Sequence, residues 1–216
     1  ILEELRKEIL SDSEIPPLGE PKGGGDRDEK ESAECKAGKK PGEDYSAACA
    51  RAKVCLGTIA KARMLLGGEN GLANYSAKFA AILERMAAAP GSSLVYSQFL
   101  DMEGVGIFRV AMDVNGYAPI DIVMTGGQLS FTKATEESLR KGPGAQPRYI
   151  TFSGVEKPEV RAAALSIFNA QFAELPASMN AVLKEVGYTD NKVGELCRVI
   201  CITSAGAEGL SLRNVR

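Results

Sequence analysis

Short apolar runs alternate with amphipathic stretches along the last two-thirds of the chain. Three runs rich in β-branched and aromatic residues predict strands: 92–99, 148–154 and 198–203. Three stretches with apolar residues at helical spacing predict helices: 74–90, 101–117 and 157–169. Strands that alternate with helices indicate a parallel sheet with helices on both faces. The pattern therefore predicts an α/β fold.

Local signals mark where these elements begin and end. Asn74 or Ser76 is suited to cap the first helix, and Pro90-Gly91 ends it. Residues 120–132 (IDIVMTGGQLSFT) have the form of a β-hairpin, because a glycine-rich turn separates two short strand-like runs. The polar stretch 133–147 predicts a loop, and 170–196 interrupts the alternation as an insertion.

The first third of the chain has a different character. Residues 1–10 carry a short helical stripe, and 11–47 are rich in proline, glycine and mixed charge, which is typical of a flexible linker. A helix is predicted at 45–66, ending at Gly67-Gly68. We therefore expect an N-terminal extension over 1–71 and a compact domain over 72–216. The first residue is Ile1, so we expect the chain to be a piece of a longer polypeptide.

Composition excludes several classes of function. The net charge is -2, from 26 basic and 28 acidic residues, so any site for a polyanion must be local. The chain has no histidine, which excludes Ser-His-Asp and Cys-His catalysis. No apolar run approaches the roughly 20 residues that span a bilayer. The five cysteines form no CxxC pair, which favours free thiols in an intracellular protein.

Small or hydrogen-bonding residues follow the apolar run of each predicted strand. They are Ser97 and Gln98, Ser153 and Gly154, and Thr203 and Ser204. Open α/β sheets bind ligands at the carboxyl ends of their strands, where hydroxyl groups and exposed backbone N–H groups hold phosphate oxygens. Each segment alone is more typical of a helix cap, a turn or a tight connection, but the three together at successive strand ends favour a ligand site.

Two nucleotide-binding motifs are excluded by their spacing. Gly104 and Gly106 begin a GxGxxG pattern, but Arg109 stands where the third glycine belongs, so we expect both glycines to pack closely on the sheet. No GxxxxGK[ST] phosphate loop occurs in the chain.

Three segments, in order, carry a family resemblance: 94–117 (LVYSQFLDMEGVGIFRVAMDVNGY), 149–169 (YITFSGVEKPEVRAAALSIFN) and 199–216 (VICITSAGAEGLSLRNVR). Residues 72–216 resemble the second RecA-like lobe of superfamily 2 helicases, and within these the Swi/Snf-like, DEAD-type helicases of large nucleocytoplasmic DNA viruses. The resemblance implies a three-layer RecA-like (P-loop NTPase-type) fold with a parallel sheet flanked by helices.

The resemblance also implies roles for particular residues. Ser97, Gln98, Ser153, Gly154, Thr203 and Ser204 match positions that contact nucleic acid. Gly206, Glu208 and Gly209 match the turn that couples this contact to the ATP cleft. The family's first lobe and its arginine-finger motif are missing from the chain, so ATP and Mg²⁺ are expected only with that lobe as partner, and no catalytic or metal-ligating residue is expected here. Arg213 and Arg216 receive no role.

Three functions stay open at this point. The chain is either the C-terminal motor lobe of an ATP-dependent helicase or translocase, which is inactive as an ATPase alone, or a non-catalytic module that binds nucleic acid or protein. The third is an unrelated nucleotide- or sugar-binding α/β domain. The expected partners are DNA or RNA, the first lobe, and viral transcription or replication proteins, with no membrane. The expected location is the viral factory, the virion, or the host cytoplasm or nucleus.

Overall fold

The computed structural model describes residues 44–58, 66–102, 104–204 and 209–215. The helix predicted at 1–10 and nearly all of the predicted linker lie outside these residues. The described part contains these elements in chain order: α3 (Tyr45–Thr58), α5 (Gly68–Tyr75), α6 (Ala77–Ala88), β1 (Ser93–Tyr96), α7 (Val105–Val114), β2 (Ala118–Pro119), β3 (Ile122–Thr125), β4 (Gln128–Phe131), α8 (Lys133–Leu139), β5 (Arg148–Phe152), α9 (Pro158–Phe168), a 3₁₀ turn (Phe172–Glu174), α10 (Ala177–Val186) and β6 (Val199–Ile202).

A parallel four-stranded sheet forms the centre, in the order β1-β6-β5-β2. Tyr96, Ile202 and Phe152 lie side by side at the ends of the first three strands. Every residue of the inner strand β6 is buried, as its unbroken apolar run predicts. The parallel sheet expected from the alternation of elements is confirmed. β2 was not predicted, because two residues are too short for any periodicity.

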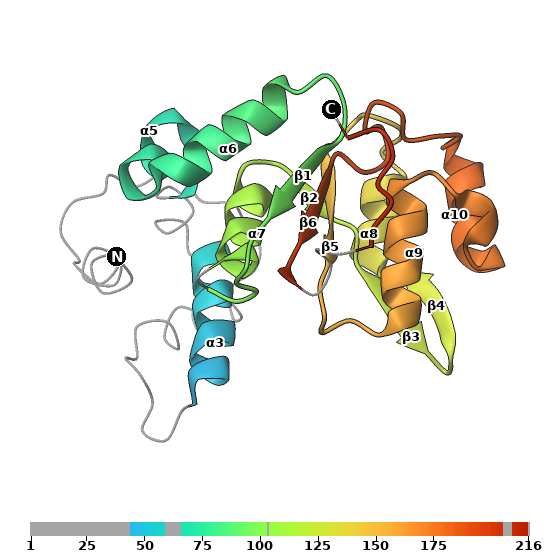
Figure 1. Cartoon of the computed structure of the whole chain (residues 1–216), viewed down its shortest axis with the longest axis horizontal. Helices are drawn as coiled ribbons and strands as arrows, with labels where there is room; N and C mark the ends of the chain where they lie inside the picture. The colour runs from blue at the N-terminus through green and yellow to red at the C-terminus, as the bar shows by residue number, and fades with distance from the viewer. Residues whose placement is uncertain (1–43, 59–65, 103, 205–208, 216) are drawn as a thin grey trace, which may run out of the picture.

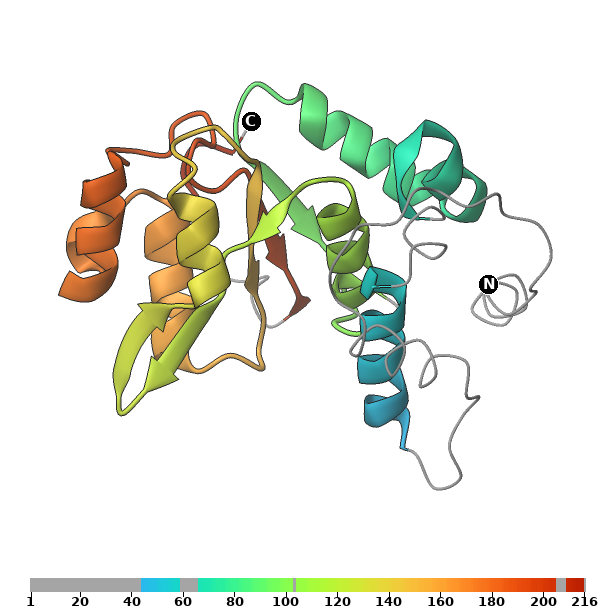
Figure 2. The same ribbon diagram turned by 180° about the vertical axis from the view of Figure 1, so that it is seen from behind.

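Helices cover both faces of the sheet (Figures 1 and 2). Because successive side chains of a strand point to opposite faces, Val199 and Cys201 of β6 pack with Met112 of α7 on one face. On the other face Ile200 packs with Ile167 of α9. The architecture is therefore α/β, with the sheet between two helical layers, and it is compatible with a RecA-like fold.

Two segments without a predicted element contain helices. The loop predicted at 133–147 is wrong for its first half, which forms α8; Thr132 caps this helix by accepting the N–H of Thr135 at 3.3 Å, and Leu139 is completely buried. Residues 170–196 contain α10, whose Leu183 is buried in the same core as α9. Segments this short show too little helical periodicity to predict a helix, and their helices depend on burial against the rest of the protein.

The predicted hairpin is confirmed. β3 and β4 pair antiparallel, and the turn between them consists of Gly126 and Gly127. Both glycines have positive φ, at 59° and 80°, which a residue with a side chain rarely adopts. The hairpin follows β2 and lies beside α9, away from β1 (Figure 1).

Three described helices precede the sheet. α3 covers the first part of the helix predicted at 45–66, and its Leu56 is buried in one cluster with Ala111 of α7. Ser76 caps α6, as predicted, by accepting the N–H of Phe79 at 3.2 Å. The expectation of free thiols holds for Cys49, Cys197 and Cys201, but it is wrong for Cys55, which forms a disulfide.

Candidate nucleic-acid interface

The three segments predicted from the strand ends lie together at the carboxyl edge of the sheet, because they follow the neighbouring strands β1, β6 and β5. The N–H of Ser97 donates to the carbonyl of Ile202 at 3.1 Å, and the N–H of Thr203 donates to that of Phe152 at 3.2 Å. These bonds fix the strand ends relative to one another. The edge is the place where open parallel sheets bind their ligands.

The segment after β1 is a tight turn. The hydroxyl oxygen of Ser97 accepts the N–H of Phe99 at 3.2 Å, and Gln98 between them is exposed. The expected packing of Gly104 and Gly106 on the sheet is wrong. A Cβ on Gly104 would lie 2.5 Å from the Ser97 hydroxyl oxygen, and one on Gly106 would lie 2.7 Å from the carbonyl oxygen of Asp101. Gly104 packs on this turn and Gly106 packs on Asp101 and the side chain of Lys53. The helix α7 begins only at Val105 instead of at the predicted Asp101.

The segment after β5 folds back on itself. Ser153 is completely buried, and its hydroxyl donates to the carboxylate of Glu156 at 2.5 Å. The same carboxylate oxygen accepts the backbone N–H of Ser153 at 2.8 Å. Both donors of Ser153 are therefore engaged inside the protein. Gly154, which follows, is exposed and is the part of this segment open to a ligand.

The segment after β6 changes from buried to exposed within two residues. Thr203 is buried, whereas Ser204 is exposed. Gly206 and Glu208, the residues assigned to coupling, lie outside the described residues. Gly209 is described; it is exposed and has a φ of 75°, a conformation that favours glycine. The exposed groups that share the edge are thus Gln98, Gly154 and Ser204.

Two exposed aromatic side chains stand beside these groups. Tyr96 is 55% exposed at the end of β1, and Phe99 is 56% exposed after the turn. Neither residue was predicted to contact a ligand, since apolar residues in a strand are usually core residues. The only signal in the sequence was that both flank the polar pair Ser97-Gln98.

A polar network, also absent from the sequence analysis, joins α7 to β5. The hydroxyl of Tyr149 donates to Asp113 at 2.8 Å and accepts from Nε of Arg109 at 3.3 Å, and Arg109 also pairs with Asp121 at 3.2 Å. Burial raises the pKa of Tyr149 and of Asp113 above their ordinary values. Burial alone would lower the pKa of Arg109, but Tyr149, Asp121 and Asp113 together raise it. These hydrogen bonds and the ion pair link α7 to β5 and to Asp121, although burial disfavours the charged form of Asp113.

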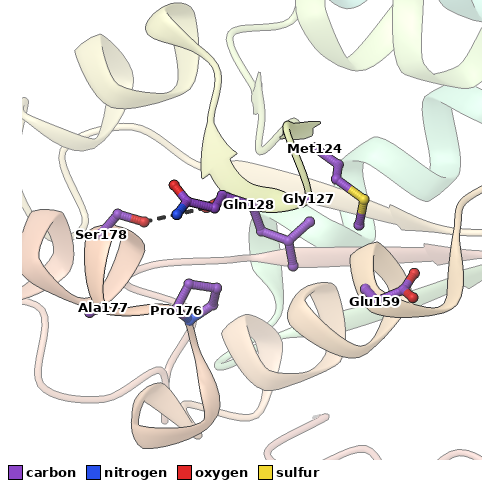
Figure 3. A pocket seen from close by; sticks show the side chains of 8 residues that line it. Met124, Gly127, Gln128, Glu159, Pro176, Ala177 and Ser178 are labelled. Atoms are coloured by element: carbon purple, nitrogen blue, oxygen red, sulfur yellow. Dashed lines mark hydrogen bonds between the residues drawn. The ribbon is translucent and has the colours of Figure 1, made fainter.

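A cavity of about 430 Å³ lies between the hairpin, α9 and the start of α10 (Figure 3). Met124 and Leu129 give it an apolar wall, and Glu159 lies on the α9 side. Ser178 donates to the carbonyl of Leu129 at 3.3 Å and so ties α10 to the hairpin. The cavity includes none of the predicted contact residues, so it is separate from the strand-end edge.

Within the described ranges, no three histidine, cysteine or acidic side chains gather into a group that could hold a metal ion. No helix in the part of the chain that the structure covers is long and apolar enough to cross a membrane. Comparison of the chain with models of protein families, with curated proteins and with solved structures found no match.

Proposed function

We propose that this chain is the nucleic-acid-contacting lobe, with a RecA-like fold, of a two-lobe ATP-dependent helicase or translocase. One observation carries the proposal: the carboxyl ends of three adjacent parallel strands bring small, hydrogen-bonding residues to a single edge. Uncharged donors at such an edge suit the phosphate oxygens of a nucleic-acid backbone. The resemblance of 72–216 to helicase lobes supports the same function.

The geometry narrows the set of contact residues. The amide of Gln98, the backbone of Gly154 and the hydroxyl of Ser204 are exposed and suited to bind phosphate groups. Ser153 and Thr203 are buried and shape the edge from inside. The proposed grip therefore depends on three of the six predicted residues directly.

In this proposal, ATP is bound between this lobe and a partner lobe. The described residues offer no group of acidic ligands for Mg²⁺, so the metal and the phosphates would be held by the partner. Gly206, Glu208 and Gly209 are proposed to face that cleft on the basis of the resemblance. In a full-length gene product, a bulky residue at Gly206 is expected to reduce nucleic-acid-stimulated ATP hydrolysis; unchanged turnover would contradict the motor function.

Nucleic-acid binding can be tested on the chain itself by fluorescence anisotropy with a labelled single-stranded oligonucleotide. Gln98→Glu replaces an exposed amide with a carboxylate of the same shape, and we expect it to weaken binding several-fold by repelling phosphate. Gln128→Glu is the matched control, since Gln128 is also exposed but lies on the hairpin that follows β2, at the opposite side of the sheet from β1. Equal effects of the two substitutions would refute the assignment of the edge.

The second candidate is a non-catalytic binding module with the same fold. The inward bonds of Ser153 and the burial of Thr203 favour it, because they leave fewer hydroxyl groups for a phosphate grip. Such a module would bind nucleic acid or protein without ATP turnover in the full-length gene product. The ATP hydrolysis assay therefore separates it from the motor.

A further inference from the structure

Tyr96 and Phe99 are unusual in their exposure. They are 55% and 56% exposed, whereas large aromatic side chains mostly lie in cores or at interfaces. They are separated by only two residues, Ser97 and Gln98, and both stand at the carboxyl edge of the sheet. An edge with two exposed aromatic rings next to hydrogen-bonding groups is suited to bind a ligand that is partly aromatic and partly polar.

The backbone that carries these rings is held firmly. The N–H of Phe99 donates to Ser97, and its carbonyl accepts the N–H of Val105 at 3.1 Å. The backbone of Gly104 packs directly against that carbonyl. Tyr96 lies in a strand and is in register with Ile202. A backbone that is already fixed loses little freedom on binding, which is how a preformed binding surface gains affinity.

The charges around the rings are compatible with a polyanion. Asp101, the acidic residue next along the chain, pairs with Lys53 at 3.2 Å. Glu156 follows β5, which is separated from β1 by β6, and its carboxylate accepts the hydroxyl and the N–H of Ser153. Lys53 therefore offsets the charge of Asp101, whereas Glu156 keeps its charge but is directed toward Ser153. Along the chain, the exposed polar residue Gln98 separates Phe99 from Tyr96.

We propose that Tyr96 and Phe99 form a stacking platform for the bases of a single nucleic-acid strand, while Gln98 and Ser204 contact its phosphates. The inference rests on the proposed nucleic-acid binding and specifies the ligand as an unpaired strand. Every base has a π face, so stacking on these rings would be tolerant of sequence. Bases inside a duplex are already stacked, so a double strand would not use the platform.

The first test uses a new fluorophore. The chain contains no tryptophan, so Phe99→Trp places a single indole on the platform. Two probes of equal length are compared: a single-stranded oligonucleotide, and an abasic oligomer with the same phosphates but no bases. We expect the oligonucleotide to quench the indole emission and to bind about tenfold or more tightly than the abasic oligomer. Equal affinity and equal quenching would overturn the platform.

The outcomes separate this inference from the proposed function. If the unsubstituted chain binds neither probe, nucleic-acid binding fails and the platform fails with it. If it binds both probes equally, phosphate binding stands and the platform alone is refuted. The comparison therefore distinguishes failure of nucleic-acid binding from failure of the platform alone.

The second test removes each ring. Tyr96→Ala and Phe99→Ala are each expected to weaken oligonucleotide binding about tenfold while leaving abasic-oligomer binding unchanged. Tyr45→Ala is the matched control, because Tyr45 is similarly exposed, at 59%, but lies away from the two rings. Lys53 is the residue of α3 that pairs with Asp101 near Phe99, and Tyr45 lies eight residues before it, about 12 Å along the helix. Phe99→Tyr should retain binding, and Phe99→Leu should not. Unchanged oligonucleotide binding with weaker self-association would identify the rings as a protein-docking surface and overturn the proposal.

Discussion

Gly104→Ala tests the turn on which the proposed interface depends. The added Cβ would lie 2.5 Å from the hydroxyl oxygen of Ser97 and 2.7 Å from the carbonyl carbon of Phe99, and closer still to the carbonyl oxygen of Phe99. Ordinary contacts of this kind are about 3.4 Å or longer, so the turn or the start of α7 must move by roughly 1 Å. The neighbours include backbone atoms, which cannot rotate away as a flexible side chain can.

The expected cost follows from two sources. Overpacking of a well-packed site costs about 1–3 kcal/mol. Movement of the turn also weakens the hydrogen bonds at the N–H and the carbonyl of Phe99, each contributing roughly 1 kcal/mol. We expect a loss of about 2–4 kcal/mol in the free energy of unfolding. With an m-value of about 2 kcal/mol/M, this lowers the urea midpoint by about 1–2 M.

Urea unfolding followed by circular dichroism measures this loss. Gly127→Ala serves as the control, because a Cβ there meets no atom within 4 Å and the substitution carries only the strain of a φ of 80°. That strain costs about 1–2 kcal/mol. The reasoning is refuted if Gly104→Ala lies within about 0.5 kcal/mol of the unsubstituted chain. Under conditions where Gly104→Ala still folds, it should also weaken oligonucleotide binding, since Phe99 moves with the turn.

Three further predictions concern packing and ionisation. Leu183→Ala should destabilise the protein by about 2–5 kcal/mol in thermal or urea unfolding, because Leu183 is completely buried, whereas Lys184→Ala on the exposed side of α10 should have little effect. Burial raises the pKa of Asp113 from its ordinary value of 3.8, so the folded protein holds this proton more tightly than the unfolded chain. Stability should therefore fall as the pH rises from about 4 through the raised pKa of Asp113, and less so in Asp113→Asn; parallel curves would contradict this. Burial raises the pKa of Cys201 to about 12, so its thiol should resist alkylation at neutral pH until the protein is denatured, as peptide mass spectrometry can show.

The main helices and strands could be predicted from the sequence because the patterns that indicate them are local. β6 is an unbroken apolar run, and Ser76 directly precedes α6, where its hydroxyl caps the helix. The glycine turn of the hairpin is equally explicit. α8 was not predicted because its seven residues are mostly polar. Its formation depends on the burial of Leu139 against distant parts of the chain.

Only part of the candidate site could be predicted from the sequence. The sequence predicted Ser153 and Gln98 at strand ends, but their positions along the chain do not predict which of the two side chains is buried. The tertiary structure directs Ser153 to Glu156 and leaves Gln98 exposed. Tyr96 and Phe99 are of residue types usual in cores, but Tyr96 lies on the edge strand β1 and Phe99 follows the turn after it, and both are exposed.

The sequence by itself determined the α/β class, the parallel sheet and the polar strand ends, because hydrophobic period, caps and turns act over a few neighbouring residues. Only the tertiary structure decided the strand order β1-β6-β5-β2 and, with it, which ends meet at one edge. It also decided which groups there are engaged and which are exposed. These properties depend on contacts between residues such as Ser97 and Ile202, which are more than a hundred positions apart, and no local pattern records them.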